Sequence, residues 1–282
     1  MEINTDLITV YIPTYNRVKF LKRAVNSVLS QSYQNFELII VDDRSQDETI
    51  QYLEKLSSND KRIIFFQNIK NSGACVSRNK AISEAKGNYI TGLDDDDEFT
   101  SDRLEFLLKN FKKNYSFTCS SSIVVDSKKS SCSSCRDLVF NEQDLLYDNV
   151  AGNQFFTYTN YLRDIGGFDE QLHSAQDLDV MVRLTRNYGA AKRFKNLTYK
   201  LYVDQDIPTI STSSKKIDGM KYFYKKHKLY MSKRQALFRR LLIRRWEKKP
   251  KTDFLNAFLI LVVNFTKTFN IIVNFICIKK VK

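Results

Sequence analysis

Residues 89–97 read Tyr-Ile-Thr-Gly-Leu-Asp-Asp-Asp-Asp, an apolar run that leads directly into four carboxylates. Adjacent carboxylates repel one another, so a fold gains nothing by collecting them at the end of a strand. A bound divalent cation reverses that penalty, because hard cations take oxygen ligands. The run Asp94–Asp97 therefore predicts a site where a metal ion holds a diphosphate. A solvated acidic loop explains the same residues when they are taken alone.

Three apolar strands and three helices are predicted upstream of residue 88, where the strand that ends in the aspartates begins. The strands are expected at 7–12, 36–41 and 63–66, and the helices at 17–31, 45–57 and 72–85. For the second helix, Ser45 is the predicted N-cap, with Glu48 completing a capping box. Apolar strands that alternate with helices indicate a mostly parallel sheet covered on both faces. Ligands bind beyond the carboxyl ends of such strands, so polar clusters there should meet.

From Asp102 onward the pattern is less regular. It predicts helices at 104–111 and 178–188, strands at 117–125, 155–161 and 193–203, and basic helices within 213–250. The whole chain is expected to be an α/β protein with a catalytic domain at 1–212. Its two halves are about 1–100 and 101–212, and a helical region of 213–282 follows.

Positive charge is concentrated at the C-terminal end. The net charge is +13, yet residues 1–212 hold 26 Lys and Arg against 29 Asp and Glu, whereas residues 213–282 hold 19 against 3. Such asymmetry predicts an anionic partner for the tail, either a membrane or nucleic acid. The catalytic half gives nucleic-acid binding no support, so no nucleic-acid partner is expected.

The tail also has an amphipathic pattern. Over 234–249, Leu237, Phe238, Leu241, Leu242 and Trp246 share one predicted helical face, and Arg239, Arg240, Arg244, Arg245 and Lys248 share the other. The apolar stretch 254–278 is interrupted by Lys267 and four asparagines. These features favour attachment in the membrane plane over a spanning helix. A core helix packed on the catalytic domain is the remaining alternative.

Five scattered cysteines and an N-terminus without a signal-peptide pattern favour a reducing cytoplasm. Cys132 and Cys135 form a lone CxxC without a second pair of metal ligands. An ordinary loop explains that spacing better than a zinc site.

Several stretches together resemble glycosyltransferase family 2, the inverting nucleotide-sugar-dependent enzymes of the GT-A fold. The resemblance covers roughly residues 5–212, in the family's order and spacing. The matching stretches are 10–17 (VYIPTYNR), 27–32 (SVLSQS), 37–47 (ELIIVDDRSQD), 71–79 (NSGACVSRN), 89–97, 166–170 (GGFDE) and 176–179 (QDLD) with Arg183.

The resemblance implies where a nucleotide sugar binds. The segment of Pro13, Thr14, Tyr15 and Arg17 would meet the base and ribose, and the Asp43 carboxylate would accept from the uracil N–H. Arg78 would lie near the diphosphate, and Asp94 and Asp95 would meet the ribose or metal-bound water. Asp96 ranks first as a ligand of Mn²⁺ or Mg²⁺, with Asp94 as the second candidate. The metal would stabilise the charge of the departing nucleoside diphosphate.

The resemblance makes Asp177 the general base that takes the acceptor hydroxyl proton. Gly167, Phe168, Asp169 and Gln176 would lie near the acceptor. Two features depart from the family pattern: Gln176 replaces the glutamate of a Glu-Asp pair, and residues 202–211 lack a histidine that many relatives place near the metal. Asp204 or Asp206 is the substitute that the sequence offers. His173 has an exposed loop position as its simplest explanation.

The expected protein is a hexosyltransferase that moves glucose, galactose or N-acetylglucosamine from a UDP-sugar to a sugar hydroxyl with a β-linkage. The expected acceptor is a polyprenyl-diphosphate-linked saccharide of surface polysaccharide (O-antigen, lipopolysaccharide or capsule) biosynthesis. The enzyme would lie on the cytoplasmic face of the inner membrane. Two alternatives stay open: a metal-dependent nucleotidyltransferase or phosphohydrolase, and a non-catalytic protein that binds nucleotide sugars at a membrane.

Overall fold

The computed structural model describes residues 6–126, 130–134, 136–152, 154–203 and 215–247. The first part alternates strands and helices as predicted: β1 (Ile8–Thr14), α1 (Val18–Leu29), β2 (Phe36–Asp42), α2 (Thr49–Asn59), β3 (Ile63–Gln67), α3 (Ala74–Glu84) and β4 (Tyr89–Gly92). These four strands pair in parallel in the order β3-β2-β1-β4. Every residue of β2 is buried, as expected for a central strand covered on both faces.

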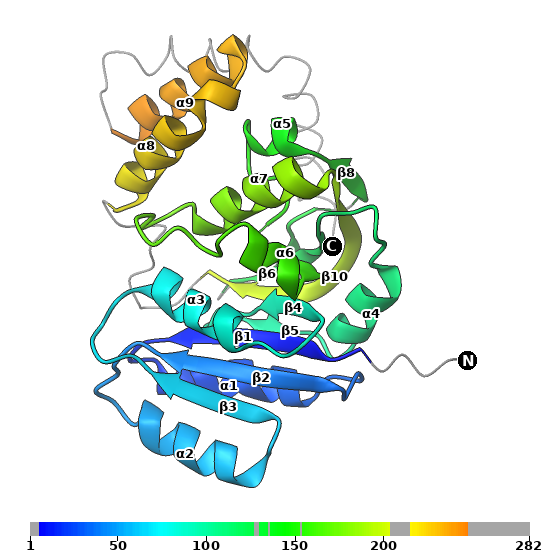
Figure 1. Cartoon of the computed structure of the whole chain (residues 1–282), viewed down its shortest axis with the longest axis vertical. Helices are drawn as coiled ribbons and strands as arrows, with labels where there is room; N and C mark the ends of the chain where they lie inside the picture. Colours follow the sequence, from blue (N-terminus) through cyan, green and yellow to red (C-terminus); the bar gives the residue numbers. More distant parts are fainter. Residues whose placement is uncertain (1–5, 127–129, 135, 153, 204–214, 248–282) are drawn as a thin grey trace.

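Helices cover both faces of this sheet (Figure 1). One apolar core includes side chains of α3 and lies between the sheet and the helices of the second half of the chain. The other core includes Leu21, Val25 and Val28 of α1 and Leu53 of α2. The apolar residues of α1 recur with helical spacing, so burying one stripe of the helix fixes it against the sheet.

The second half of the sheet is mixed, which corrects the expectation of a mostly parallel arrangement. The order continues β4-β9-β6-β10-β5; β6 and β10 are parallel, but β9 is antiparallel to β4 and to β6. The elements are β5 (Glu98–Phe99), α4 (Arg103–Asn110), β6 (Thr118–Val125), β7 (Ser130–Cys132), β8 (Leu138–Phe140), α5 (Glu142–Leu145), β9 (Phe156–Tyr158), α6 (Thr159–Asp164), α7 (Gln176–Tyr188) and β10 (Ala191–Tyr202). The strand predicted at 155–161 is only three residues long and gives way to α6.

The predicted start of α2 was also wrong. The helix begins at Thr49, and the side chain of Asp47 accepts hydrogen bonds from the backbone N–H groups of Thr49 and Val18 at 3.1 Å each. The Ser45 hydroxyl instead accepts from the backbone N–H of Asn16 at 2.8 Å. The side chains of Ser45 and Asp47 therefore bind the loop at the end of β1 and the start of α1, next to the predicted nucleotide site.

Beyond β10 the structure describes α8 (Lys215–His227), a 3₁₀ helix η2 (Lys228–Tyr230) and α9 (Lys233–Trp246). Figure 1 places α8 and α9 beyond α7, at the opposite end of the molecule from α2. Phe223 of α8 is fully buried in the same core as α7. The basic helices predicted in 213–250 are confirmed, and their described part packs on residues of the predicted 101–212 half.

The predicted faces of the tail helix need correction. Phe238 and Leu241 of α9 are buried, but so is Arg239, which was expected on the exposed basic face. Its guanidinium donates to the backbone oxygens of Leu145 and Leu146 at 2.9 Å, at the end of α5. A cation is favourable at a helix C-terminus, so Arg239 attaches α9 to the fold. Trp246 remains 45% exposed.

None of the helices in the described part of the chain is long and apolar enough to cross a membrane. The apolar stretch predicted at 254–278 lies outside the described residues.

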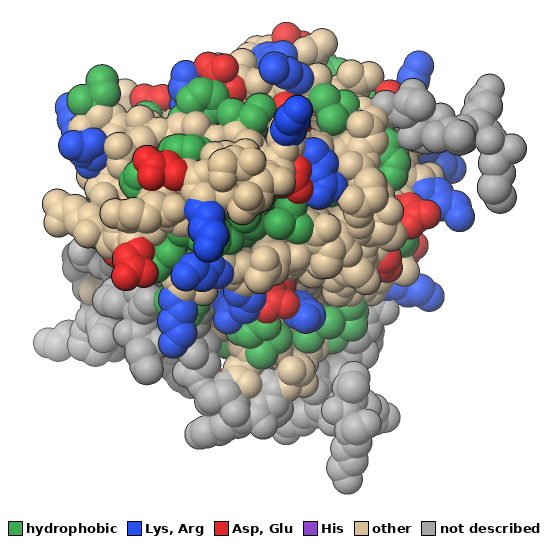
Figure 2. All heavy atoms as spheres, turned by 90° about the horizontal axis from the view of Figure 1, so that it is seen from below, with side chains coloured by type: hydrophobic (Ala, Val, Ile, Leu, Met, Phe, Trp, Pro, Cys, Tyr) green, Lys and Arg blue, Asp and Glu red, His purple; other side chains and the backbone are tan. Residues whose placement is uncertain are grey.

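On the face seen in Figure 2, Lys and Arg side chains lie among Asp and Glu side chains and do not form one continuous basic surface. This view is from below Figure 1, where the first half of the chain lies. The mixture agrees with the near balance of charge in residues 1–212.

Candidate functional site

The polar ends of β1 and β4 meet, as the parallel sheet predicted. The Thr14 hydroxyl donates to Asp95 Oδ2 at 2.8 Å, and the Arg17 guanidinium lies 3.1 Å from Asp95 Oδ1 and 2.9 Å from Asp96 Oδ2. Register explains the contact: β1 and β4 pair side by side from Ile8–Tyr89 to Tyr11–Gly92, so both strands deliver the residues that follow to one edge. The described residues thus place Thr14 and Arg17 beside the aspartate run.

Arg78 links the aspartate run to α7. One guanidinium nitrogen donates to Asp94 Oδ1 at 2.9 Å and the other to Gln176 Oε1 at 2.7 Å. The Arg78 side chain is buried. Burial disfavours its charge, but the carboxylates of Asp177 and Asp94 outweigh that effect and raise the pKa of Arg78. A fixed cation therefore lies between the predicted donor residues and the predicted base.

Asp43 lies at the end of β2 and accepts three hydrogen bonds from the loop before α3. They come from the backbone N–H groups of Ser72 at 2.8 Å and Gly73 at 2.7 Å and from the Asn68 amide at 2.7 Å. Gly73 has φ 93°, a conformation that glycine adopts without strain. Asp43 thus attaches the start of α3, the helix of Arg78, to the strand edge. Tyr15 on the neighbouring loop is exposed, with its ring available for stacking.

Asp42, the residue before Asp43, has a structural role. It is fully buried, and its carboxylate accepts from the Ser45 backbone N–H at 3.0 Å and from the Gln67 amide at 3.0 Å.

Asp177 lies in the first turn of α7, beside Gln176 and close to the Arg78 charge. Its Oδ1 atom is buried and accepts no hydrogen bond from the described residues. Burial raises the pKa of Asp177 to about 6, while Arg78 lowers it and Asp94 raises it. A buried carboxylate oxygen without a partner is uncommon, and a pKa near neutrality suits proton transfer at physiological pH.

The raised pKa of Asp177 predicts a pH profile. A base works only when it is deprotonated, so kcat/KM for transfer should be constant above about pH 7 and fall about tenfold per unit below pH 6. The measurement is initial rates from pH 5 to 9 with saturating metal ion. UDP affinity is measured at each pH by calorimetry, because burial also raises the pKa of Asp95 on the donor side to about 6. A profile that stays flat down to pH 5 contradicts this assignment.

The loop of residues 166–170, predicted to lie near the acceptor and called the acceptor loop below, is attached to both α3 and α7. The Asn79 amide donates to the Phe168 carbonyl at 2.9 Å and accepts from the Phe168 N–H at 2.7 Å, while Arg183 donates to the Gly167 carbonyl at 2.6 Å. Gly167 has φ 65°, and a Cβ there would overlap the Asn79 side chain. Arg78 lies over the Phe168 ring, 5.2 Å from its centroid. The loop and the donor residues therefore share Arg78 and α3.

The members of the aspartate run have two kinds of partner: Asp97 binds β10, whereas Asp94, Asp95 and Asp96 contact Arg78, Thr14 and Arg17. Asp97 accepts from the Tyr199 hydroxyl at 2.7 Å and from the Tyr202 backbone N–H at 2.9 Å, so it binds β10. Burial, together with the charges of Asp94 and Asp96, raises its pKa to about 8. Burial and Asp94 also raise the pKa of Asp96. The raised pKa values show that the carboxylates of the run repel one another, and a divalent cation would relieve that repulsion.

The donor set fits a hard cation. Carboxylate oxygens of Asp94 and Asp96 are the ligands that Mg²⁺ and Mn²⁺ prefer. Within the described ranges, however, no group of three His, Cys, Asp or Glu side chains is arranged around one point. A metal ion held by one or two carboxylates would complete its shell with substrate phosphate and water, as magnesium usually does. Asp204 and Asp206, the suggested substitutes for a histidine, lie outside the described residues.

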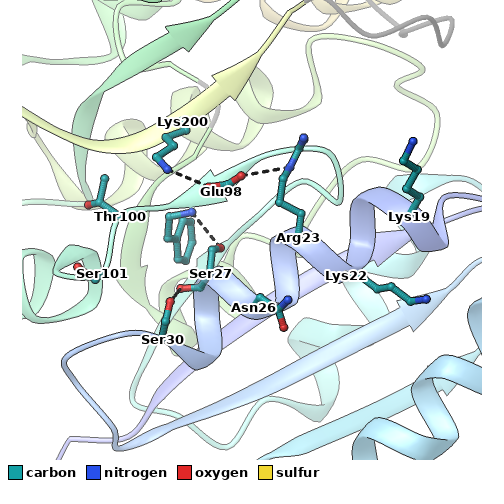
Figure 3. Close-up of a pocket in the computed structure, with 11 residues that line it drawn as sticks. Lys19, Lys22, Arg23, Asn26, Ser27, Ser30, Glu98, Thr100, Ser101 and Lys200 are labelled. Atoms are coloured by element: carbon teal, nitrogen blue, oxygen red, sulfur yellow. Dashed lines mark hydrogen bonds and ion pairs between the residues drawn. The ribbon is translucent and has the colours of Figure 1, made fainter.

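An open hollow of about 870 Å³ lies between α1, β5 and β10. Its lining includes Lys19, Lys22, Arg23, Glu98 and Lys200 (Figure 3). Arg23 and Lys200 both pair with Glu98, at 3.2 and 3.0 Å, and Arg23 also donates to the Asp96 carbonyl. The residues that line the hollow do not include the predicted catalytic residues.

Two buried residues that no sequence motif indicated lie next to the site. The Tyr11 hydroxyl and both amide atoms of Gln154 are buried and have no hydrogen-bond partner in the described residues. A Cβ added to Gly92 would clash with both the Tyr11 ring and the Gln154 amide, so the two side chains crowd the end of β4. Unpartnered buried polar atoms could have revealed them, but only from coordinates. His173, in contrast, is exposed, as expected.

Comparisons with known proteins identify the family of the chain. A profile described as glycosyl transferase family 2 matches residues 9–165. The Escherichia coli K12 protein named "Putative colanic acid biosynthesis glycosyl transferase WcaA" is 38% identical over 233 residues, 80% of this chain and 82% of that protein. Chondroitin synthase of Pasteurella multocida is 30% identical over 225 residues, 76% of this chain but 22% of that protein.

The fold has a solved counterpart. The crystal structure of S. aureus TarS 1–349 with UDP-GlcNAc has a TM-score of 0.65 at 21% identity and covers 78% of this chain and 66% of that one. At this identity the likeness concerns the fold alone. The α/β fold with its mixed sheet is GT-A-like. The chain belongs to glycosyltransferase family 2 and is a glycosyltransferase.

Proposed function

We propose that this enzyme transfers a hexose or N-acetylhexosamine, with inversion, from a UDP-sugar to a sugar hydroxyl of a polyprenyl-diphosphate-linked saccharide, forming a β-linkage in surface polysaccharide biosynthesis. The observation that carries the proposal is Asp177: a buried carboxylate oxygen without a partner, placed by α7 beside Arg78 and the aspartate run. The colanic acid name of the E. coli relative and the UDP-GlcNAc in TarS support the pathway and the donor class.

The donor side would use residues already connected in the fold. Asp43 would accept from the uracil N–H, the Tyr15 ring would stack on the base, and Arg17 with Asp95 would border the ribose. Asp96, with Asp94 as the second candidate, would hold Mn²⁺ or Mg²⁺. A divalent cation there would stabilise the negative charge that grows on the diphosphate.

In the proposed chemical step, Asp177 is the general base. Its carboxylate takes the proton of the acceptor hydroxyl while that oxygen attacks the anomeric carbon. The bond between this carbon and the donor phosphate oxygen breaks, and UDP leaves with the electron pair. One carboxylate suffices, because attack from the face opposite UDP needs no covalent sugar–enzyme intermediate. Inversion of an α-linked donor gives a β-linked product.

The predicted membrane location is also part of the proposal. Residues 213–282 carry a net charge of +16, and Trp246 and Leu237 are exposed on α9 among Arg240, Arg244 and Arg245. Basic helices with exposed aromatic side chains suit an anionic lipid surface. Attachment there, on the cytoplasmic face of the inner membrane, would bring the site to a lipid-linked acceptor.

A donor screen followed by product analysis tests the function. UDP-sugars with Mn²⁺ should raise the melting temperature of the enzyme more than GDP-sugars do, because ligands that bind only the folded state stabilise it. With a polyprenyl-diphosphate saccharide, mass spectrometry should then show one added hexose or N-acetylhexosamine. Proton NMR of the product should give a β-anomeric coupling.

Two results contradict the proposal. An α-linked product rules out inversion of the usual α-linked donor. Release of free sugar at the same rate with and without acceptor favours the rival phosphohydrolase, which the family membership otherwise sets aside.

A further inference from the structure

The end of α8 contacts the rear of the helix that carries the predicted base. Asp179 is two residues beyond Asp177 on α7, and residues two apart point to different sides of a helix. Asp177 lies beside Arg78, whereas Asp179 contacts α8. Whatever holds Asp179 therefore fixes the turn from which Asp177 projects.

Asp179 is fully buried and accepts bonds from three cationic or donor groups. Lys226 Nζ and His227 Nε2 lie 2.9 and 2.8 Å from its Oδ1 atom, and Arg183 lies 2.7 Å from its Oδ2 atom. Burial opposes ionisation, but the His227 hydrogen bond and the charges of Arg183 and Lys226 outweigh it and hold the pKa of Asp179 well below its usual range. A fully bonded buried carboxylate is a rigid attachment point.

Lys226 also binds the acceptor loop. Its Nζ atom lies 2.6 Å from Oδ2 of Asp169, in the loop that contains Gly167 and Phe168. One ammonium group therefore connects that loop to the first turn of α7. The side chain is 27% exposed, so replacing it leaves no large buried cavity.

His227 holds the same turn from the adjacent position. Its Nδ1 atom lies 3.2 Å from the Arg186 guanidinium, which can only donate, so Nε2 carries the proton given to Asp179. Arg186 in turn pairs with Glu142 at 2.6 Å. These contacts bind α8, α7 and α5 into one unit, although α8 follows the predicted catalytic domain in the sequence.

We propose that Lys226, together with His227, is a positioning residue for the transfer reaction. Through Asp179 and Asp169 it fixes the orientation of the predicted base, Asp177, relative to the acceptor loop. The inference rests on the proposed function and adds that α8 belongs to the catalytic unit and is not only a membrane attachment. Lys226 contacts none of the predicted donor-binding residues, so its replacement should lower turnover with acceptor and leave donor binding unchanged.

The test compares Lys226→Met with Lys221→Met. Lys221 lies on the same helix and pairs with Glu247 at 2.6 Å, away from α7, so it is a matched control. We expect Lys226→Met to lower kcat about 10- to 100-fold, because small misplacements of a catalytic group have effects of this size. UDP affinity and donor KM should match wild type. Lys226→Arg, which keeps the cation, should recover most of the rate.

Hydrogen–deuterium exchange provides a readout that needs no acceptor. Peptides covering residues 166–179 should exchange faster in Lys226→Met and at the wild-type rate in Lys221→Met. Equal kcat values and equal exchange for the two variants overturn the inference. A Lys226→Met loss that comes with weaker UDP binding also overturns it. A wild-type enzyme that binds UDP yet transfers no sugar contradicts the proposed function instead, and the exchange result then stands by itself.

Discussion

Replacing Asp177 by Asn should lower kcat for sugar transfer by about 10²- to 10⁴-fold, the range in which general acid–base groups contribute. The amide cannot take the acceptor proton, but it has nearly the same shape, so the fold and the Arg78 contacts should persist. UDP and UDP-sugar affinities, measured by calorimetry with Mn²⁺, should equal those of wild type. The loss should therefore be confined to turnover.

Asp164→Asn is the control for this experiment. Asp164 lies at the end of α6 in the same half of the protein and accepts from the Tyr188 hydroxyl at 2.8 Å, outside the site. Its replacement should leave kcat unchanged. If Asp177→Asn keeps wild-type turnover, another group removes the proton and the assignment of the base is wrong.

Replacing Asp96 by Asn should reduce kcat/KM by at least about 100-fold and weaken Mn²⁺-dependent UDP binding. Metal stabilisation of a leaving group is worth several kcal/mol, and each 1.36 kcal/mol is a factor of ten in rate. Asn also relieves repulsion in the aspartate run, so the variant should be at least as stable to heat as wild type without metal. Rates and melting temperatures, each with Mn²⁺ and with EDTA, separate the two effects.

Asp102→Asn is the control on the same side of the protein. Asp102 is exposed and accepts from the Thr100 hydroxyl at 2.5 Å, so its charge is not part of the aspartate run. Its replacement should not change metal dependence. An Asp96→Asn enzyme that responds to Mn²⁺ as wild type does would show that another carboxylate binds the metal, with Asp94 as the next candidate.

Much of the first half of the fold was predictable, because its signals are local. Strands β1 to β4 are short apolar runs that end in polar residues, and helix α1 has an apolar stripe of regular spacing. The convergence of Thr14, Arg17 and Asp94–Asp97 followed from parallel pairing alone. The cap of α2 was mispredicted because Ser45 and Asp47 both suit a cap, and tertiary contacts of Ser45 with Asn16 decide between them.

The second half was less predictable, because its structure depends on distant partners. Strand β9 has three residues and exists through antiparallel pairing with β4 and β6, which no local periodicity reveals. Arg239 fitted the basic face of an amphipathic helix, yet it is buried and donates to the carbonyls of Leu145 and Leu146 at the end of α5. Lys226 and His227 belong to no motif that the sequence shows. Their partner Asp179 is 47 and 48 residues away in the chain, so only the packed structure identifies them.

A crystal structure of the wild-type protein with UDP and Mn²⁺ would show directly whether nucleotide and metal bind at the acidic strand edge. We expect an anomalous peak about 2.1 Å from an Asp96 carboxylate oxygen, the uracil against Asp43, and the diphosphate between the metal and Arg78. The Asp177 carboxylate should lie on the side of the β-phosphate where the donor sugar and the acceptor would bind. Nucleotide and metal bound away from this strand edge would contradict the proposed site.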